Sequence, residues 1–198
     1  MKELLIKYMK RFSSLSEEEL RKLTTDVPVA SFKKGTILLQ QGDVPNKCYF
    51  VLEGCVRQYA VSADGKETTF NFFTEEQSVT IFNQHAIDKA SKYSLSCLED
   101  CTLVVGDLST EQDMYDKHPV LQMMTRKMIE EDIGNMRDDF ASFIASSPEE
   151  RYNALVEKRP DLINRVPQYQ LASYLGITPE SLSRIKKRTE ASHLRVVD

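Results

Sequence analysis

Long apolar runs are missing from this 198-residue sequence. No stretch approaches the roughly 18 consecutive apolar residues that a membrane helix needs, and the first segment, Met1–Lys10, carries four charged residues among its apolar ones. We therefore expect no membrane span, no signal peptide and a cytoplasmic protein. The composition, 41% hydrophobic and 28% charged, is that of an ordinary folded protein, and the length suits two small domains.

Close cysteine pairs and clustered histidines are missing too. The four cysteines are spread over apolar, strand-like stretches: Cys48, Cys55, Cys97 and Cys101. This spacing fits neither a zinc site nor a thiol redox motif, so we expect buried, reduced thiols. The histidines have no partners at metal-ligand or triad spacing: His85, His118 and His193. There is no glycine-rich phosphate loop either, so the sequence predicts no metal, no cofactor and no enzyme. The alternative that stays open is an active site built from residues that are distant in sequence and converge in space.

The net charge of -4 is unevenly distributed. Residues Pro148–Asp198 carry nine Lys and Arg against seven Asp and Glu, a net +2, whereas Met1–Ser147 carries 17 against 23, a net -6. Four of the C-terminal cations fall within five positions: Arg184, Lys186, Lys187 and Arg188. A charge cluster alone is more often a solvated face, but this one is able to attract phosphates on an acidic protein.

The first half of the chain has the pattern of a β domain preceded by two short helices. Ser16 and Glu19 form a capping box, which predicts a helix start. From Ala30 to about Asp107, short runs of β-branched and aromatic residues are broken every 7 to 12 residues by glycine-containing turns. Asp64-Gly65 predicts a hairpin whose two turn residues tolerate positive φ. We expect a sandwich or barrel here.

After Ser109 the pattern takes the period of a helix, and one long helix is predicted over His118–Ile144. Its apolar residues form a coiled-coil-like seam: Leu121, Met124, Met128, Ile129, Ile133, Met136, Phe140 and Phe143. Such a stripe could pack on the chain's own β domain. A helix of roughly 27 residues is roughly 40 Å long, however, and exceeds the width of a small barrel. We therefore expect a parallel homodimer.

Ser147 and Pro148 predict the start of a new helix, with a serine N-cap and a proline at the first helical position. Further short helices are expected at Pro148–Glu157 and around Pro160–Asn164. This gives three parts: a β domain with its leading helices over residues 1–115, a dimerisation helix over 116–147 and a helical domain over 148–198.

The segment Gln170–Ile185 fits a helix-turn-helix. Ala172 is small where two helices would cross closely, and Gly176 lies where the tight turn needs positive φ. Thr178 is placed to cap the second helix and Pro179 to begin it. The shared core is supplied by Leu171, Leu175, Ile177, Leu182 and Ile185. An ordinary helical hairpin is the alternative.

The polar residues left off that core are the predicted DNA contacts. They are Gln168, Thr178, Glu180, Ser181, Ser183, Arg184, Lys187 and Arg188. Arg184 is able to bind guanine O6 and N7, and Glu180 to accept from cytosine N4. Gln168, Ser181, Lys187 and Arg188 are better placed for phosphates.

The segment Leu171–Arg188 resembles the helix-turn-helix of Crp/Fnr transcription regulators. The earlier glycine-punctuated stretch resembles the cyclic-nucleotide-binding barrel of that family: Lys34-Gly35-Thr36, Gly42-Asp43, Glu53-Gly54 and Asp64-Gly65. The resemblance covers most of the chain in the family's order. It implies an α+β fold: an antiparallel jelly-roll barrel, a long dimerisation helix and a C-terminal helix-turn-helix. It also implies that Glu180 and Arg184 read bases.

Four features depart from the family pattern. Pro179 replaces a second base-reading arginine, so the preferred DNA site should differ from the familiar one. The segment from Glu76 to Tyr93 lacks the Gly-Glu-Leu and the arginine that hold a cyclic nucleotide; Lys89 and Lys92 could attract an anion there, but only as point charges. No cysteine precedes Cys48, which argues against an iron-sulfur cluster. Only ten residues follow Arg188, too few for the usual β-hairpin wing.

The sequence therefore predicts a bacterial, homodimeric transcription regulator. Its expected partners are palindromic double-stranded DNA, a second copy of the chain and an unknown small-molecule effector if it is not constitutive, with RNA polymerase as a further candidate. The alternatives are a true cyclic-nucleotide-responsive regulator and a ligand-binding barrel with weak DNA affinity.

Overall fold

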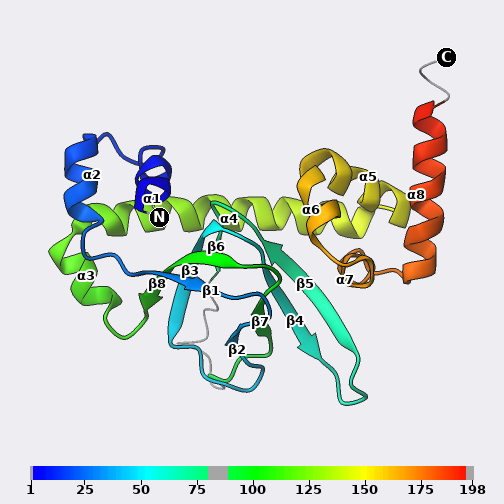
Figure 1. Ribbon diagram of the computed structural model, residues 1–198, viewed down its shortest axis with the longest axis horizontal. Helices are drawn as coiled ribbons and strands as arrows, with labels where there is room; N and C mark the ends of the chain where they lie inside the picture. The colour runs from blue at the N-terminus through cyan, green and yellow to red at the C-terminus, as the bar shows by residue number, and fades with distance from the viewer. Residues whose placement is uncertain (1, 80–88, 195–198) are drawn as a thin grey trace. The chain divides into compact units, whose positions relative to one another are not determined.

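The computed structural model describes residues 2–79 and 89–194 (Figure 1). The chain forms two compact units. The first comprises residues 1–58 and 72–135, and the second comprises residues 59–71 and 136–198. None of the described helices is long and apolar enough to cross a membrane.

Two four-stranded sheets make up the β region, with the orders β1-β8-β3-β6 and β2-β7-β4-β5. Their strands are β1 (Val29–Phe32), β2 (Ile37–Leu39), β3 (Lys47–Glu53), β4 (Val56–Val61), β5 (Glu67–Phe73), β6 (Ser78–Val79), β7 (Ser94–Cys97) and β8 (Cys101–Asp107). The pairs β1–β8, β3–β8, β3–β6 and β2–β7 are antiparallel. The predicted β-rich first half of the chain is thereby confirmed.

Strand β3 divides its side chains between two hydrophobic clusters, because successive residues of a strand point to opposite faces. Tyr49 and Val51 pack with residues of β4, β6, β7 and β8. Phe50 and Leu52 pack instead with helix residues, including Met124. The β region of the first unit is therefore packed on both faces of its central strand.

Helices α1 (Lys2–Met9) and α2 (Glu17–Leu23) supply most of that second cluster, beside the first half of α4 (Pro119–Ala145) (Figure 1). A further short helix, α3 (Glu111–Lys117), precedes α4. The predicted capping box at α2 is present, since the Ser16 backbone N–H donates to Glu19 over 2.8 Å and the Glu19 N–H to Ser16 Oγ over 3.3 Å. Helix α4 confirms the single long helix expected over residues 118–144.

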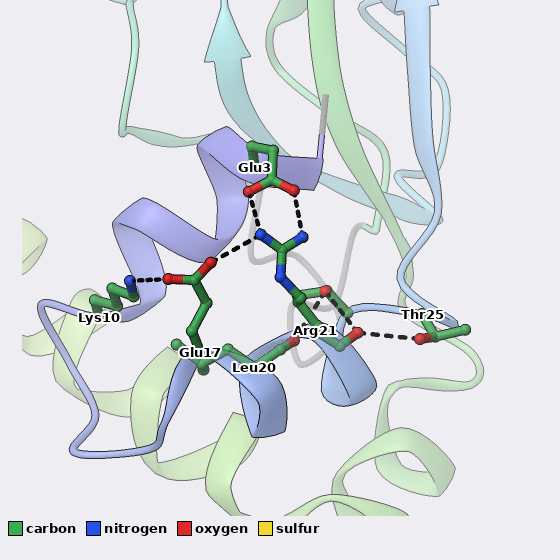
Figure 2. Close-up of polar contacts among 7 residues, drawn as sticks. Glu3, Lys10, Glu17, Leu20, Arg21 and Thr25 are labelled. Atoms are coloured by element: carbon green, nitrogen blue, oxygen red, sulfur yellow. Dashed lines mark hydrogen bonds and ion pairs between the residues drawn. The ribbon is translucent and has the colours of Figure 1, made fainter.

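An exposed ion network joins α1 to α2 (Figure 2). Arg21 Nη2 donates to Glu3 Oε2 over 2.9 Å and to Glu17 Oε1 over 2.8 Å, and Lys10 Nζ donates to Glu17 Oε2 over 2.7 Å. Hydrogen bonds from Lys10 and Arg21 lower the pKa of Glu17 to about 2. Solvent-exposed pairs contribute little to stability, so the apolar cluster beneath them holds these helices in place.

The β4–β5 hairpin is confirmed, but its turn differs from the expected two-residue form. The Ser62 N–H donates to Lys66 O over 3.0 Å, which leaves three residues in the loop, and Gly65 N–H closes a turn to Ser62 O over 2.9 Å. Only Gly65 takes positive φ, at 80°. This is a three-residue loop with the glycine in the left-handed region, so Asp64 is spared the strain that two positive φ values would impose.

The four cysteines are free thiols, as predicted. Cys55, Cys97 and Cys101 are buried, and Cys48 is half-buried with its pKa raised by burial. Within the described residues, no three Cys, His, Asp or Glu side chains are grouped to hold a metal ion.

Prolines mark the beginnings of the helices in the second unit, where the missing N–H of proline costs nothing. These helices are α5 (Pro148–Lys158), α6 (Pro160–Arg165), α7 (Gln168–Tyr174) and α8 (Pro179–Leu194). The predicted Ser147 cap is present as a capping box with Glu150. Tyr152 and Leu155 of α5 and Leu162 of α6 are buried, which gives this unit a core of its own.

Candidate nucleic-acid interface

Helices α7 and α8 are joined by a tight turn with clear physical causes. Gly176 has φ of 70°, and its N–H donates to Ser173 O over 3.1 Å. The next N–H, of Ile177, donates back to Ala172 O over 3.0 Å, so the carbonyls at the end of α7 are satisfied within the turn. The predicted glycine position is confirmed.

Helix α8 begins as the sequence predicted. The Ser181 N–H donates to Thr178 Oγ1 over 3.2 Å, so Thr178 caps the helix and Pro179 is its first residue. Four of the five residues predicted to form the shared core are buried, namely Leu171, Leu175, Leu182 and Ile185, and so is Ala172, the small residue expected at the helix crossing. Ile177 is half-buried. Because the buried residues Leu182 and Ile185 occupy one side of α8, its other side is presented to solvent.

The predicted DNA contacts lie on that open side or at the start of α7. Those that are exposed are Gln168, Thr178, Glu180, Ser183, Arg184, Lys187 and Arg188. Ser181 is half-buried. Most of the polar side chains that the sequence singled out are therefore exposed to solvent.

Hydrogen bonds order the first turns of this exposed face. Thr178 Oγ1 donates to Ser181 Oγ over 3.2 Å, and Arg184 Nη2 donates to the same oxygen over 3.3 Å. The backbone N–H of Glu180, the Thr178 hydroxyl and the charge of Arg184 lower the pKa of Glu180. The helix thus presents a fixed carboxylate and a guanidinium one turn apart.

A hollow of about 590 Å³ runs beside this face, between α8 and the start of α5. Its lining combines apolar and cationic side chains: Pro148, Ile177, Ser181, Arg184, Ile185, Lys187 and Arg188. One of these cations, Arg188, is paired with Glu149 over 3.1 Å.

Two residues at this site were not predicted. Gln170 of α7 is buried at 6% exposure; its Nε2 donates to the Tyr169 hydroxyl over 3.1 Å, and its Oε1 has no partner among the described residues. Arg151 of α5 reaches the turn itself, where its Nη1 donates to Leu175 O over 3.1 Å. A cation near the start of a helix opposes the helix dipole, and that mismatch was the available signal for Arg151.

The predicted seam divides along α4. Met124 is buried and Met128 packs against the same cluster of the first unit, beside Leu121. Ile129 is half-buried. The later residues are open: Ile133 is 45% exposed, Met136 64%, Phe140 66% and Phe143 37%. Ile144, which was not predicted, is 65% exposed.

The candidate effector contacts, Lys89 and Lys92, are both exposed. Between them Ser91 is buried, and its hydroxyl donates to Tyr93 O over 2.7 Å. Residues 80–88, which include His85 and much of the segment compared with the nucleotide-binding motif, lie outside the described residues. So do residues 195–198, on which the expected lack of a wing partly depends; α8 itself continues to Leu194.

Residues 29–118 match the family model of the cyclic nucleotide-binding domain. A search of curated proteins found no match to the sequence.

Several solved structures share the fold of most of the chain. FixK2 from Bradyrhizobium japonicum aligns with a TM-score of 0.66 at 16% identity, covering 84% of this chain and 86% of FixK2. The c-di-GMP-responsive global regulator CLP of Xanthomonas campestris aligns with a TM-score of 0.66 at 15% identity, covering 90% and 94%. A CooA mutant from Carboxydothermus hydrogenoformans aligns with a TM-score of 0.63 at 15% identity, covering 93% and 83%.

Proposed function

Because residues 29–118 match a cyclic nucleotide-binding domain and the chain has the fold of Crp/Fnr regulators, we propose that it is a homodimeric, DNA-binding transcription regulator. The observation that carries this proposal is the α7–turn–α8 unit, with its buried core and its ordered polar face. In the proposal this unit is a helix-turn-helix, the two sheets close into a jelly-roll barrel, and α4 is the dimerisation helix. Residues 1–115, 116–147 and 148–198 are the corresponding functional parts.

In this proposal α8 is the recognition helix and enters the major groove of DNA. Its N-terminal residues would then meet base edges, with Arg184 on a guanine and Glu180 on a cytosine. Lys187, Arg188 and Gln168 would bind phosphates, and the hollow beside α8 would receive the strand that passes it. The exposure of these side chains and the hydrogen bond from Arg184 to Ser181 support this assignment.

The open apolar residues of α4 support a dimer. A large exposed apolar stripe, which here includes Met136 and Phe140, is unusual for a monomer. In a dimer, the same stripe of a second copy would bury it. A two-fold dimer binds a roughly palindromic site, with half-site centres about 34 Å apart. RNA polymerase would be a partner at the promoter rather than part of this assembly.

The β domain is proposed to sense a small-molecule effector of another class, or to act constitutively. The second candidate, a regulator that responds to a cyclic nucleotide, is favoured by the family match over residues 29–118. Lys89 and Lys92 lack the bidentate geometry with which arginine holds a cyclic phosphate. Titration calorimetry with cyclic AMP and cyclic GMP distinguishes the two candidates, since only the second predicts heat of binding.

Selection of binding sites from random double-stranded DNA, followed by mobility shifts, tests the DNA proposal. We expect an enriched palindrome, and an affinity that falls steeply with salt as phosphate contacts release counterions. The control is the same palindrome with about five base pairs inserted between its halves, which turns one half-site to the opposite side of the duplex and should abolish tight binding. Failure to enrich any sequence, or affinity that ignores salt, would contradict the proposal.

A further inference from the structure

The Arg151 side chain joins the ends of two helices. Its Nε donates to Phe143 O and to Ser146 O, each over 3.1 Å, at the end of α4. Its Nη1 donates over 3.1 Å to Leu175 O, at the end of α7. The guanidinium also lies over the Phe143 ring, 4.0 Å from the ring centroid.

These contacts provide hydrogen-bond donors for carbonyl groups at the ends of the two helices. The last carbonyls of a helix have no partner within it and carry the negative end of the helix dipole. One guanidinium satisfies such carbonyls on α4 and α7 together, with charge-assisted bonds and a cation–π contact. The arginine therefore binds two helix ends, at Ser146 and at Leu175, that lie 29 residues apart in sequence.

The turn between α7 and α8 fits closely against this arginine. A Cβ added to Gly176 would lie 3.3 Å from Arg151 Nη1 and 3.5 Å from the Phe143 ring. Gly176 already has φ of 70°. The turn and the guanidinium are thus in contact without intervening space.

We propose that Arg151 is a positioning residue that fixes the direction of α8 relative to the last turn of α4. This inference rests on the proposed function, since it concerns how a recognition helix is aimed. A dimer presents two recognition helices from two α4 helices, so their separation depends on how rigidly each α8 is tied to its α4. Arg151 supplies that tie, and movement of α4 is passed through it to the DNA-reading helix.

A second contact between α4 and α5 provides a matched control. Lys158 Nζ donates to Asp139 Oδ1 over 3.0 Å, but both side chains are more than 60% exposed. An exposed pair constrains its helices weakly. Like Arg151, Lys158 is a cation that joins α4 and α5. Its loss should nevertheless leave the direction of α8 unchanged.

The test is the distribution of distances between spin labels on α4 and α8, measured without DNA. The labels replace Asp138 and Ser183, both exposed, in a full-length Cys48→Ser background, and labelled chains are diluted with unlabelled ones to isolate distances within one chain. The parent and Lys158→Gln are expected to give one narrow distribution. Arg151→Lys keeps the charge but loses the planar fork, and is expected to broaden the distribution at least about twofold.

DNA affinity and thermal unfolding complete the test. We expect unlabelled Arg151→Lys to bind the selected DNA about tenfold more weakly, the equivalent of one charge-assisted hydrogen bond. Its unfolding midpoint should stay near that of the parent. If Arg151→Lys does not fold, Phe143→Leu removes the ring contact with Arg151 while it keeps an apolar side chain in the stripe of α4, and is expected to broaden the distribution as well.

A distribution for the folded variant as narrow as that of the parent would overturn the inference. If the parent shows a narrow distribution that the variant broadens, yet neither binds DNA, the proposed function fails while the positioning role stands.

Discussion

At Gly176 and Gly134, the same substitution should have opposite effects. Gly176 holds φ of 70°, a conformation that costs an L-residue about 1–2 kcal/mol, whereas Gly134 is an exposed helical glycine with nothing within 4 Å of an added Cβ. We expect Gly176→Ala to lower the free energy of unfolding by about 1–2 kcal/mol. Gly134→Ala should raise it by about 0.5–1 kcal/mol, because alanine loses less backbone entropy in a helix.

Urea denaturation of both variants checks this pair. Equal effects of the two substitutions, in either direction, would show that the turn at Gly176 does not impose the left-handed conformation.

Residues whose role is local were predictable from the sequence. Gly176, Thr178 and Ser147 act through backbone conformation and caps, which depend on neighbours a few positions away. Arg151 and Gln170 were not predicted, because their partners or burial come from packing between separate helices. A single sequence carries no direct record of such contacts.

At the scale of elements, helix α4 shows what periodicity predicts and what it omits. Its length and stripe followed from the spacing of apolar residues. The spacing did not show that Met124 and Met128 pack into the first unit while Phe140 stays exposed to solvent. The same spacing of apolar residues fits both packing within one chain and contact with a second chain. Likewise, the hairpin was predicted from Asp64-Gly65, but its loop length depends on which backbone groups pair across it.

If the open half of α4 forms a dimer, a charge placed in its stripe should separate the chains. Phe140→Asp would bury an uncompensated carboxylate in the apolar contact, at a cost of about 3 kcal/mol or more, and weaken dimerisation by about 100-fold or more. Sedimentation equilibrium over a range of concentrations measures the change.

The control for that experiment is Asn135→Asp, which adds the same charge to an exposed position about 120° around the helix from the stripe. It should leave the dimer intact. A parent chain that stays monomeric at tens of micromolar, or a Phe140→Asp dimer as tight as the parent's, would rule out this stripe as the interface.

For the whole molecule, net charge is informative only when it is counted separately for each part of the chain. The net charge of -4 argues against a nucleic-acid partner, yet the open face of α8 is cationic and lies on the part of the chain with a net +2. The family match over residues 29–118 and the fold shared with FixK2 and CLP agree with the β domain and the long helix that the sequence predicted. The identity of any effector was not predictable, since recognition of a small molecule would depend on side chains that converge in space.

The affinity of Arg184→Ala for the selected palindrome, measured by mobility shift at moderate salt, tests the central claim most directly. The control is Lys186→Ala, which removes the same charge from a half-buried position of the same helix. If α8 reads DNA through Arg184, the Arg184 variant loses about 1–3 kcal/mol, about 5- to 150-fold in affinity, and relaxes its preference at one base pair of each half-site. The Lys186 variant should change much less and keep the parent's sequence preference. Parent-like affinity and preference in Arg184→Ala would contradict the account.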